Sequence, residues 1–206
     1  MVEQELRPVS ALAGVAVPGR HGVRSGPAGL SLRERDGLQI VSIAARREQD
    51  GTVAEAVRNG WGVALPTVPR FVDGKGVAFV WAGAGQWLAI AGPAGKGAVP
   101  LFEALREACG SAASLTVQGD GRAVLSVGGP AAREVLASVV SIDLHPRVFK
   151  AGDTALTLAN HVGVQIRQLD DSPCFELLAF RAFGGSVFET VLHAGLPFGV
   201  EVLPPG

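Results

Sequence analysis

The chain has 206 residues, of which 48% are hydrophobic and 18% charged, with a formal net charge of −1. A chain of this length can bury a sizeable core, and without a basic run it has no electrostatic attraction to a nucleic-acid backbone. The low charged fraction favours an apolar surface covered by partner chains, because large exposed apolar patches usually mark interfaces. A core rich in glycine and alanine is the alternative explanation.

Composition also bears on where the protein acts. Cys109 and Cys174 are its only cysteines, which predicts reduced side chains rather than a disulfide framework. The first five residues, MVEQE, are acidic where a signal peptide would be basic. Residues 77–95 are uncharged but contain four glycines and a proline, which favours a buried β-hairpin over a membrane helix of about 20 apolar residues. The sequence thus predicts a cytoplasmic protein that binds no membrane.

Two parts of the chain differ in pattern. Residues 1–37 are rich in glycine, proline and arginine without a sustained period, which predicts an extended arm lying on the body of the fold or on a partner. Residues 38–206 are expected to form one α+β body. Its first helix should begin at Thr52, where Glu55 completes a capping box, and end before a left-handed Gly60. The other elements predicted up to residue 119 are strands at 38–43, 77–81, 86–90 and 115–118 and an amphipathic helix at 99–109 that Gly110 should stop.

The second half repeats this order of elements. Pro130 is expected at the first position of a helix, where its missing N–H costs nothing, and the buried face of that helix is expected to consist of Ala132, Val135, Leu136 and Val139. Gly195 is expected to stop the last helix. The strands predicted here lie at 122–127, 154–158, 162–168, 175–180 and 198–202, and the last helix at 186–194. The sequence therefore predicts two ferredoxin-like β-α-β-β-α-β units, at about residues 38–119 and 120–206, the second with one extra strand.

The sequence contains no complete phosphate-binding or metal-binding motif. Gly128-Gly129-Pro130 follows a predicted strand, but it lacks the third glycine of a dinucleotide fingerprint and its proline removes an amide donor. We interpret it as a structural turn. None of the four histidines has the spacing of a metal pair or a cysteine close to it in sequence, so no zinc site is predicted.

The segment Asp143-Leu144-His145-Pro146-Arg147 is the most unusual polar pattern. Residues two apart on an extended segment point the same way, so Asp143, His145 and Arg147 are expected to share one face. An Asp–His pair could act as a general base with its orienting carboxylate. No nucleophile motif accompanies it, which favours a polar anchor against another backbone.

Four motifs in order resemble the gamma subunit family of heterotetrameric sarcosine oxidase. These are L-P-x-x-P-R at residues 65–70, W-x-G-x-x-x-W-L at 81–88, G-P-x-A-R-E-V-L at 129–136 and D-L-H-P-R-x-F at 143–149. Two family segments depart from the pattern. D-Q-S-D-G-R appears as VQGDGR at residues 117–122, and R-S-F-A appears as RAFG at residues 181–184.

This resemblance implies a reduced relative of the aminomethyltransferase (T-protein) folate-binding fold. It implies a complex that oxidatively demethylates sarcosine to glycine, forming H2O2 and methylene-tetrahydrofolate. FAD, FMN, NAD, zinc and tetrahydrofolate are then expected in the other subunits, and this chain is expected to be a noncatalytic subunit without an active site. Its partners would be the alpha, beta and delta subunits, alpha most directly.

The resemblance places the candidate subunit interface on the first and last motifs. The expected interface residues are Leu65, Pro66, Pro69, Arg70, Asp143, His145, Pro146, Arg147 and Phe149. Two alternatives stay open. One is a free-standing folate-binding one-carbon enzyme of the aminomethyltransferase type, for which no carboxylate is clearly placed in a pterin-sized pocket. The other is an interaction module of a different amine oxidase.

Overall fold

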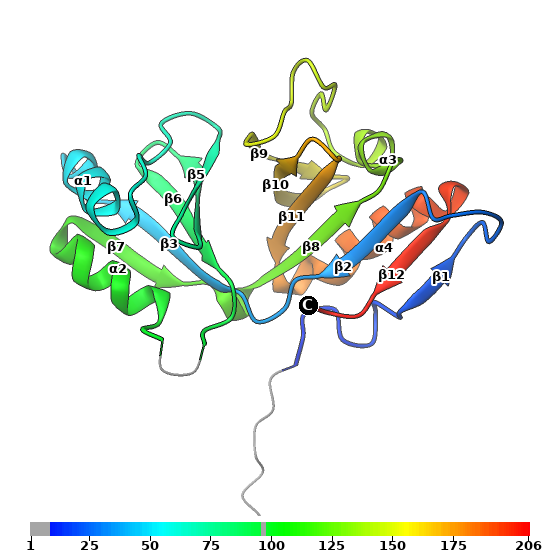
Figure 1. Cartoon of the computed structure of the whole chain (residues 1–206), viewed down its shortest axis with the longest axis horizontal. Helices are drawn as coiled ribbons and strands as arrows, with labels where there is room; N and C mark the ends of the chain where they lie inside the picture. Colours follow the sequence, from blue (N-terminus) through cyan, green and yellow to red (C-terminus); the bar gives the residue numbers. More distant parts are fainter. Residues whose placement is uncertain (1–8, 96–97) are drawn as a thin grey trace, which may run out of the picture.

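A computed structural model describes residues 9–95 and 98–206. These residues form two β-sheets, and two helices pack on one face of each sheet (Figure 1). The five-stranded sheet has the order β4-β5-β6-β3-β7, and the seven-stranded sheet has the order β1-β12-β2-β8-β11-β10-β9. The predicted α+β fold class is confirmed.

The five-stranded sheet is ferredoxin-like. Its elements are β3 (Gln39–Ala45), α1 (Asp50–Trp61), β4 (Phe71–Gly74), β5 (Val77–Gly83), β6 (Gln86–Ala91), α2 (Leu101–Cys109) and β7 (Ala113–Val117). All of its strand pairs are antiparallel. The series β3-α1-β5-β6-α2-β7 is the β-α-β-β-α-β order, and β4 adds an edge strand. The predicted hairpin within residues 77–95 is confirmed as the pair β5–β6.

The start and end of α1 differ from the prediction. The helix begins at Asp50, and the side chain of its N-cap residue, Gln49, makes no capping hydrogen bond. Because the Gln49 carbonyl already accepts from the Val53 amide at 3.0 Å, Thr52 lies inside the first turn and the expected capping box is wrong. The left-handed residue that ends the helix is Gly62, at φ 77°, and not Gly60.

The seven-stranded sheet belongs mainly to the second half. Its elements are β1 (Gly19–His21), β2 (Leu30–Glu34), β8 (Arg122–Gly128), α3 (Ala132–Val139), β9 (Thr154–Ala159), β10 (Val162–Asp170), β11 (Cys174–Phe180), α4 (Gly184–Gly195) and β12 (Val200–Leu203). The described part of the chain also contains four short 3-10 helices, η1 (Gly110–Ala112), η2 (Gly119–Gly121), η3 (Arg181–Phe183) and η4 (Leu196–Phe198). The spatial order β12-β8-β11-β10 of a ferredoxin-like unit is present, with β2 inserted between β12 and β8.

The insertion of β2 corrects the prediction of an extended arm. β2 pairs parallel with β12 and antiparallel with β8, and its Leu30 and Leu32 are fully buried. The arm is therefore wrong for residues 19–21 and 30–34, while residues 1–8 lie outside the described residues. Five strand residues carry too short an alternation to be recognised, and their pairing partners lie far away in sequence. The pseudo-repeat boundaries at about residues 119 and 120 stay a prediction.

Two predicted helix ends are also displaced. α3 begins at Ala132, two residues after Pro130, because the Ala131 amide donates to the Gly29 carbonyl at 2.9 Å beside β2. Pro130 thus belongs to the preceding turn. Gly195 is the last residue of α4 rather than its stop, since the chain continues into η4. The buried face predicted for α3 is confirmed at Ala132, Val135, Leu136 and Val139.

The inner faces of the two sheets pack against each other. A buried cluster joins Ile40, Leu88 and Ile90 of the five-stranded sheet to Val124 and Leu178 of the seven-stranded sheet. The helices lie on the opposite, outer faces, where each pair closes its own core. In the described ranges no helix has the length and apolar character to cross a membrane.

Candidate functional site

The first and last predicted motifs meet at the outer edge of β9. They line one hollow of 460 Å³, which we call the β9-edge hollow. Its lining residues are Val68, Pro69, Arg70, Ile142, Asp143, Val148, Phe149, Asp153, Thr154 and Ala155. Two segments that the sequence singled out separately therefore form one surface.

An ion pair and backbone bonds fix the first motif to the start of β9. Arg70 Nη1 lies 3.0 Å from Asp153 Oδ1, and Arg70 Nη2 donates to the Ala151 carbonyl at 3.2 Å. The Thr154 amide donates to the Pro69 carbonyl at 3.1 Å. Because the Arg70 side chain is 51% exposed, its ion pair contributes at most about 1 kcal/mol. It orients the guanidinium at the rim more than it stabilises the fold.

The last motif is a turn and not an extended strand. Asp143 Oδ1 accepts from the His145 amide at 2.8 Å, and His145 Nδ1 accepts from the Arg147 amide at 3.2 Å. The Phe149 amide then donates to the His145 carbonyl at 2.9 Å. The expected extended conformation is wrong, because aspartate readily bonds the backbone two residues on, and the common face of Asp143, His145 and Arg147 stays a prediction. Asp143 bonds the backbone of His145 and not its ring, so the pair lacks the geometry of an oriented general base.

Arg133 of α3 joins this turn to β10 through hydrogen bonds. It donates to the Leu144 carbonyl, to the Phe149 carbonyl at 3.2 Å and to Gln168 Oε1 at 2.9 Å. Its guanidinium also lies 5.2 Å from the centre of the Phe175 ring. In the sequence, Arg133 was recognisable only as one residue of the third motif, without a structural role. Its position explains why the third and fourth motifs occur together.

The nine candidate interface residues fall into a buried group and an exposed group. Leu65, Pro66 and Phe149 are buried inside the chain, and the Pro66 carbonyl accepts from Trp87 Nε1 at 2.8 Å. Leu65 and Pro66 support the surface from within, whereas the buried Phe149 also lines the β9-edge hollow. The place of these three residues in a subunit interface stays a prediction. The exposed candidates are Pro69, Arg70, Asp143, His145, Pro146 and Arg147.

Sequence reasoning missed the apolar side chains of this surface. Val68 and Val148 are 54% and 60% exposed, and both line the β9-edge hollow. They occupy the variable positions of their motifs, so motif matching alone did not single them out. The surface is apolar at its centre, with Arg70 and Asp143 at its rim.

A second hollow of 580 Å³ lies where the two sheets diverge, and we call it the inter-sheet cleft. One wall is formed by residues of β3, β5 and β6 and the other by residues of β8, β9, β10, β11 and η3. The Arg122 guanidinium lies 4.1 Å from the centre of the Phe180 ring in this cleft. Burial lowers the pKa of Arg122, although an arginine remains a cation at neutral pH.

The thiols and possible metal ligands form no centre in the described ranges. Cys109 and Cys174 are both free, and burial raises the pKa of each thiol. Among residues 9–95 and 98–206 no group of three or more His, Cys, Asp or Glu side chains could hold a metal ion. Trp81 and Trp87 are register partners on β5 and β6, and the Trp87 indole is bonded inside the chain.

Comparison with known proteins identifies relatives by sequence and by fold. Residues 46–194 match the family described as "Sarcosine oxidase, gamma subunit family". Sarcosine oxidase subunit gamma of Corynebacterium sp. (strain P-1) is 38% identical over 111 residues, which are 52% of this chain and 51% of that protein. The matched region thus spans about half the length of this curated relative.

Two solved structures share the fold. A chain of heterotetrameric sarcosine oxidase from Corynebacterium sp. U-96 superposes with a TM-score of 0.78 at 24% identity, covering 93% of this chain and 96% of that one. Glycine cleavage system aminomethyltransferase T from Bartonella henselae gives a TM-score of 0.61 at 14% identity, covering 85% of this chain and 48% of that one. The family match covers most of the chain, including all four motifs and the whole β9-edge hollow, and the chain belongs to the sarcosine oxidase gamma subunit family.

Proposed function

We propose that this chain is the gamma subunit of a heterotetrameric sarcosine oxidase and that it supports the complex without catalysing a step itself. The match of residues 46–194 to the gamma subunit family carries this proposal. The complex would oxidatively demethylate sarcosine to glycine, with formation of H2O2 and methylene-tetrahydrofolate. It would act in the cytoplasm.

The local chemistry of the chain supports a noncatalytic role. The Asp143 carboxylate and the His145 ring nitrogen are engaged with backbone amides of their own turn. FAD, FMN, NAD, zinc and tetrahydrofolate would then be held by the alpha, beta and delta subunits. The free-standing folate enzyme is not favoured, because the matching family is one of subunits.

The β9-edge hollow is the docking surface in this proposal, with the alpha subunit as the most direct partner. Its exposed Val68 and Val148 offer an apolar centre, while Arg70, Asp143 and Arg147 offer charged groups around it. Subunit interfaces commonly combine an apolar core with a polar rim, and arginine is enriched in them. Arg133 is hydrogen-bonded to the turn of the last motif and Arg70 is paired with Asp153, and such ordering before docking lowers the entropy lost on binding.

Co-expression with the alpha, beta and delta subunits tests the proposal. Native mass spectrometry is expected to find one copy of each subunit, and sarcosine-dependent peroxide formation or complex stability is expected to fall when this chain is omitted. A monomer that ignores these partners would contradict the proposal. In that case a rise in the melting temperature of the isolated chain on adding tetrahydrofolate would support the folate-binding alternative.

A further inference from the structure

We infer that the inter-sheet cleft is a second docking site, which receives an apolar polypeptide segment bearing a carboxylate from a partner subunit. This inference rests on the proposed function, because the segment belongs to another subunit of the same complex. It assigns a role to a hollow that shares no lining residue with the β9-edge hollow.

One wall of the cleft exposes large apolar side chains. Leu156, Phe180 and Phe183 are 56%, 54% and 50% exposed, and they come from β9, β11 and η3. On the opposite wall Ile43, Trp87 and Leu88 are buried, and the partly exposed residues include the small Ser42, Ala44 and Ala82. Large side chains facing small ones leave a slot between the sheets, and a partner that fills it would remove apolar surface from water.

The apolar strip continues past the cleft along β9. Leu156 and Leu158 pair with Gln165 and Gly163 of β10, and residues two apart on a strand share one face. Leu158 is 47% exposed but does not line the cleft. A bound small molecule would leave Leu158 uncovered, whereas an extended polypeptide segment would cover both leucines.

The chemistry of the partner follows from Arg122. It is the one charged residue among the described residues that line the cleft, and within the described chain it forms no ion pair. Its Nε donates to Gln118 Oε1 at 3.4 Å, while a guanidinium carries five N–H donors. A cation held on an aromatic ring in a partly desolvated slot attracts a carboxylate, which arginine can bind through two parallel hydrogen bonds.

Competition for limiting partners tests the role of Arg122. A variant chain and a differently tagged wild-type chain are co-expressed with the other three subunits, and their ratio in the purified complex is measured by mass spectrometry. R122Q is expected at about one tenth of the wild-type level, a change of about 1.4 kcal/mol, because it removes a hydrogen-bonded charge pair and leaves the partner carboxylate without its cation. R122K keeps the charge and should recover part of the loss. Equal incorporation of R122Q and wild type overturns the inference.

A matched pair of variants tests the apolar wall of the cleft. F183S is expected to be incorporated several-fold less than wild type, whereas V99S should be incorporated equally. Val99 is also an exposed apolar residue, at 67%, but it lines neither the cleft nor the β9-edge hollow. Equal incorporation of F183S would overturn the inference, as would an equal loss with V99S.

A photo-crosslink covers the case in which a variant fails to fold. Benzoylphenylalanine replaces Phe183 in the full chain, and the assembled complex is irradiated. The expected product joins this position to a partner peptide that contains large apolar residues and an Asp, a Glu or a C-terminal carboxylate. A complex that forms without this crosslink, or with a small molecule in the cleft, overturns the inference alone. A wild-type chain that enters no complex removes the proposed function as well.

Discussion

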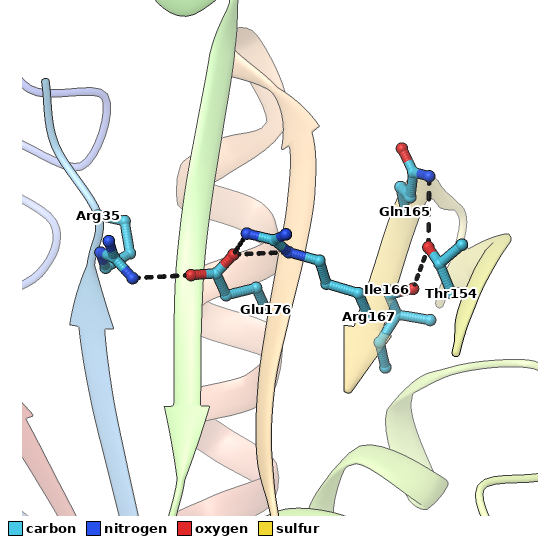
Figure 2. A network of polar contacts seen from close by, with 6 residues as sticks. All are labelled: Arg35, Thr154, Gln165, Ile166, Arg167 and Glu176. Carbon is cyan, nitrogen blue, oxygen red and sulfur yellow. Dashed lines mark hydrogen bonds and ion pairs between the residues drawn. The ribbon is translucent and has the colours of Figure 1, made fainter. Parts of the chain in front are cut away.

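Arg167 of β10 and Glu176 of β11 are register partners on the face of their sheet that packs against the other sheet. Arg167 Nε and Nη2 donate to Glu176 Oε2 at 2.9 and 2.5 Å, and Arg35 Nη1 donates to Glu176 Oε1 at 2.9 Å (Figure 2). The Arg167 guanidinium also lies 5.1 Å from the centre of the Phe71 ring of β4. One buried carboxylate therefore holds an arginine that reaches from one sheet to the other.

Replacing Glu176 by glutamine should destabilise the fold strongly. The variant leaves the buried Arg167 charge without its ionic partner, which typically costs about 3–5 kcal/mol. Urea unfolding of E176Q measures this change. The double variant R167M/E176L is the control and should lose much less, because it removes both buried charges and their desolvation penalty. A loss below about 1 kcal/mol in E176Q would contradict the account.

The two glycines at the end of α1 should respond in opposite directions. Gly60 has open space around its Cβ position and an ordinary φ, so G60A should raise the free energy of unfolding by about 0.5–1 kcal/mol. Gly62 has φ 77°, and G62A should lower it by about 1 kcal/mol because alanine disfavours the left-handed conformation. Thermal unfolding of both variants measures the two changes in the free energy of unfolding. The reverse order would show that the helix ends at Gly60.

An aspartate in the β9-edge hollow should impair assembly without affecting folding. Val148 is 60% exposed, so V148D should change the free energy of unfolding by less than about 0.5 kcal/mol. Its incorporation into the complex against wild type should fall at least tenfold, because docking would bury an unpaired charge. V17D is the control, since Val17 is 58% exposed and lines neither hollow. Normal incorporation of V148D would exclude this hollow as an interface.

The raised pKa values of the two thiols predict that the free energy of unfolding falls at alkaline pH. Burial raises the pKa of Cys109 and is the main cause raising that of Cys174, so on raising the pH the unfolded chain loses these protons before the folded chain. The stabilisation is present below the unfolded thiol pKa and is lost as pH rises through the folded value. The free energy of unfolding should therefore decline above about pH 8.5.

Urea unfolding at several pH values measures the decline. C109A should reduce its slope without abolishing it, because Cys174 still titrates. The rate of alkylation by iodoacetamide gives an independent check, since only the thiolate reacts. The half-buried Cys174 should react before the buried Cys109. Rapid modification of Cys109 in the folded chain would contradict the burial of that side chain.

Local patterns in the sequence predicted most of the secondary structure. The apolar spacing of residues 99–109 and of Ala132, Val135, Leu136 and Val139 identified α2 and α3, and Gly110 follows α2 as predicted. Strands β3, β5, β6 and β8 were found within a few residues of their ends. Such features depend on neighbours three or four positions away, or two in a strand, so the sequence itself contains them. The four motifs that resemble the family are likewise short runs of neighbouring residues, so they can be read from the sequence alone.

The arrangement of these elements was decided by contacts between residues distant in sequence. β2 lies between β12 and β8 because Leu30 and Leu32 complete a core built from the rest of the chain. The first interface motif is bonded to the start of β9 and the last is bonded to Arg133 of α3, so that both line one hollow while Leu65 and Pro66 are buried inside the chain. Strand pairing and burial depend on how whole faces fit together, which local spacing does not encode. The inter-sheet cleft likewise exists only where two complete sheets diverge.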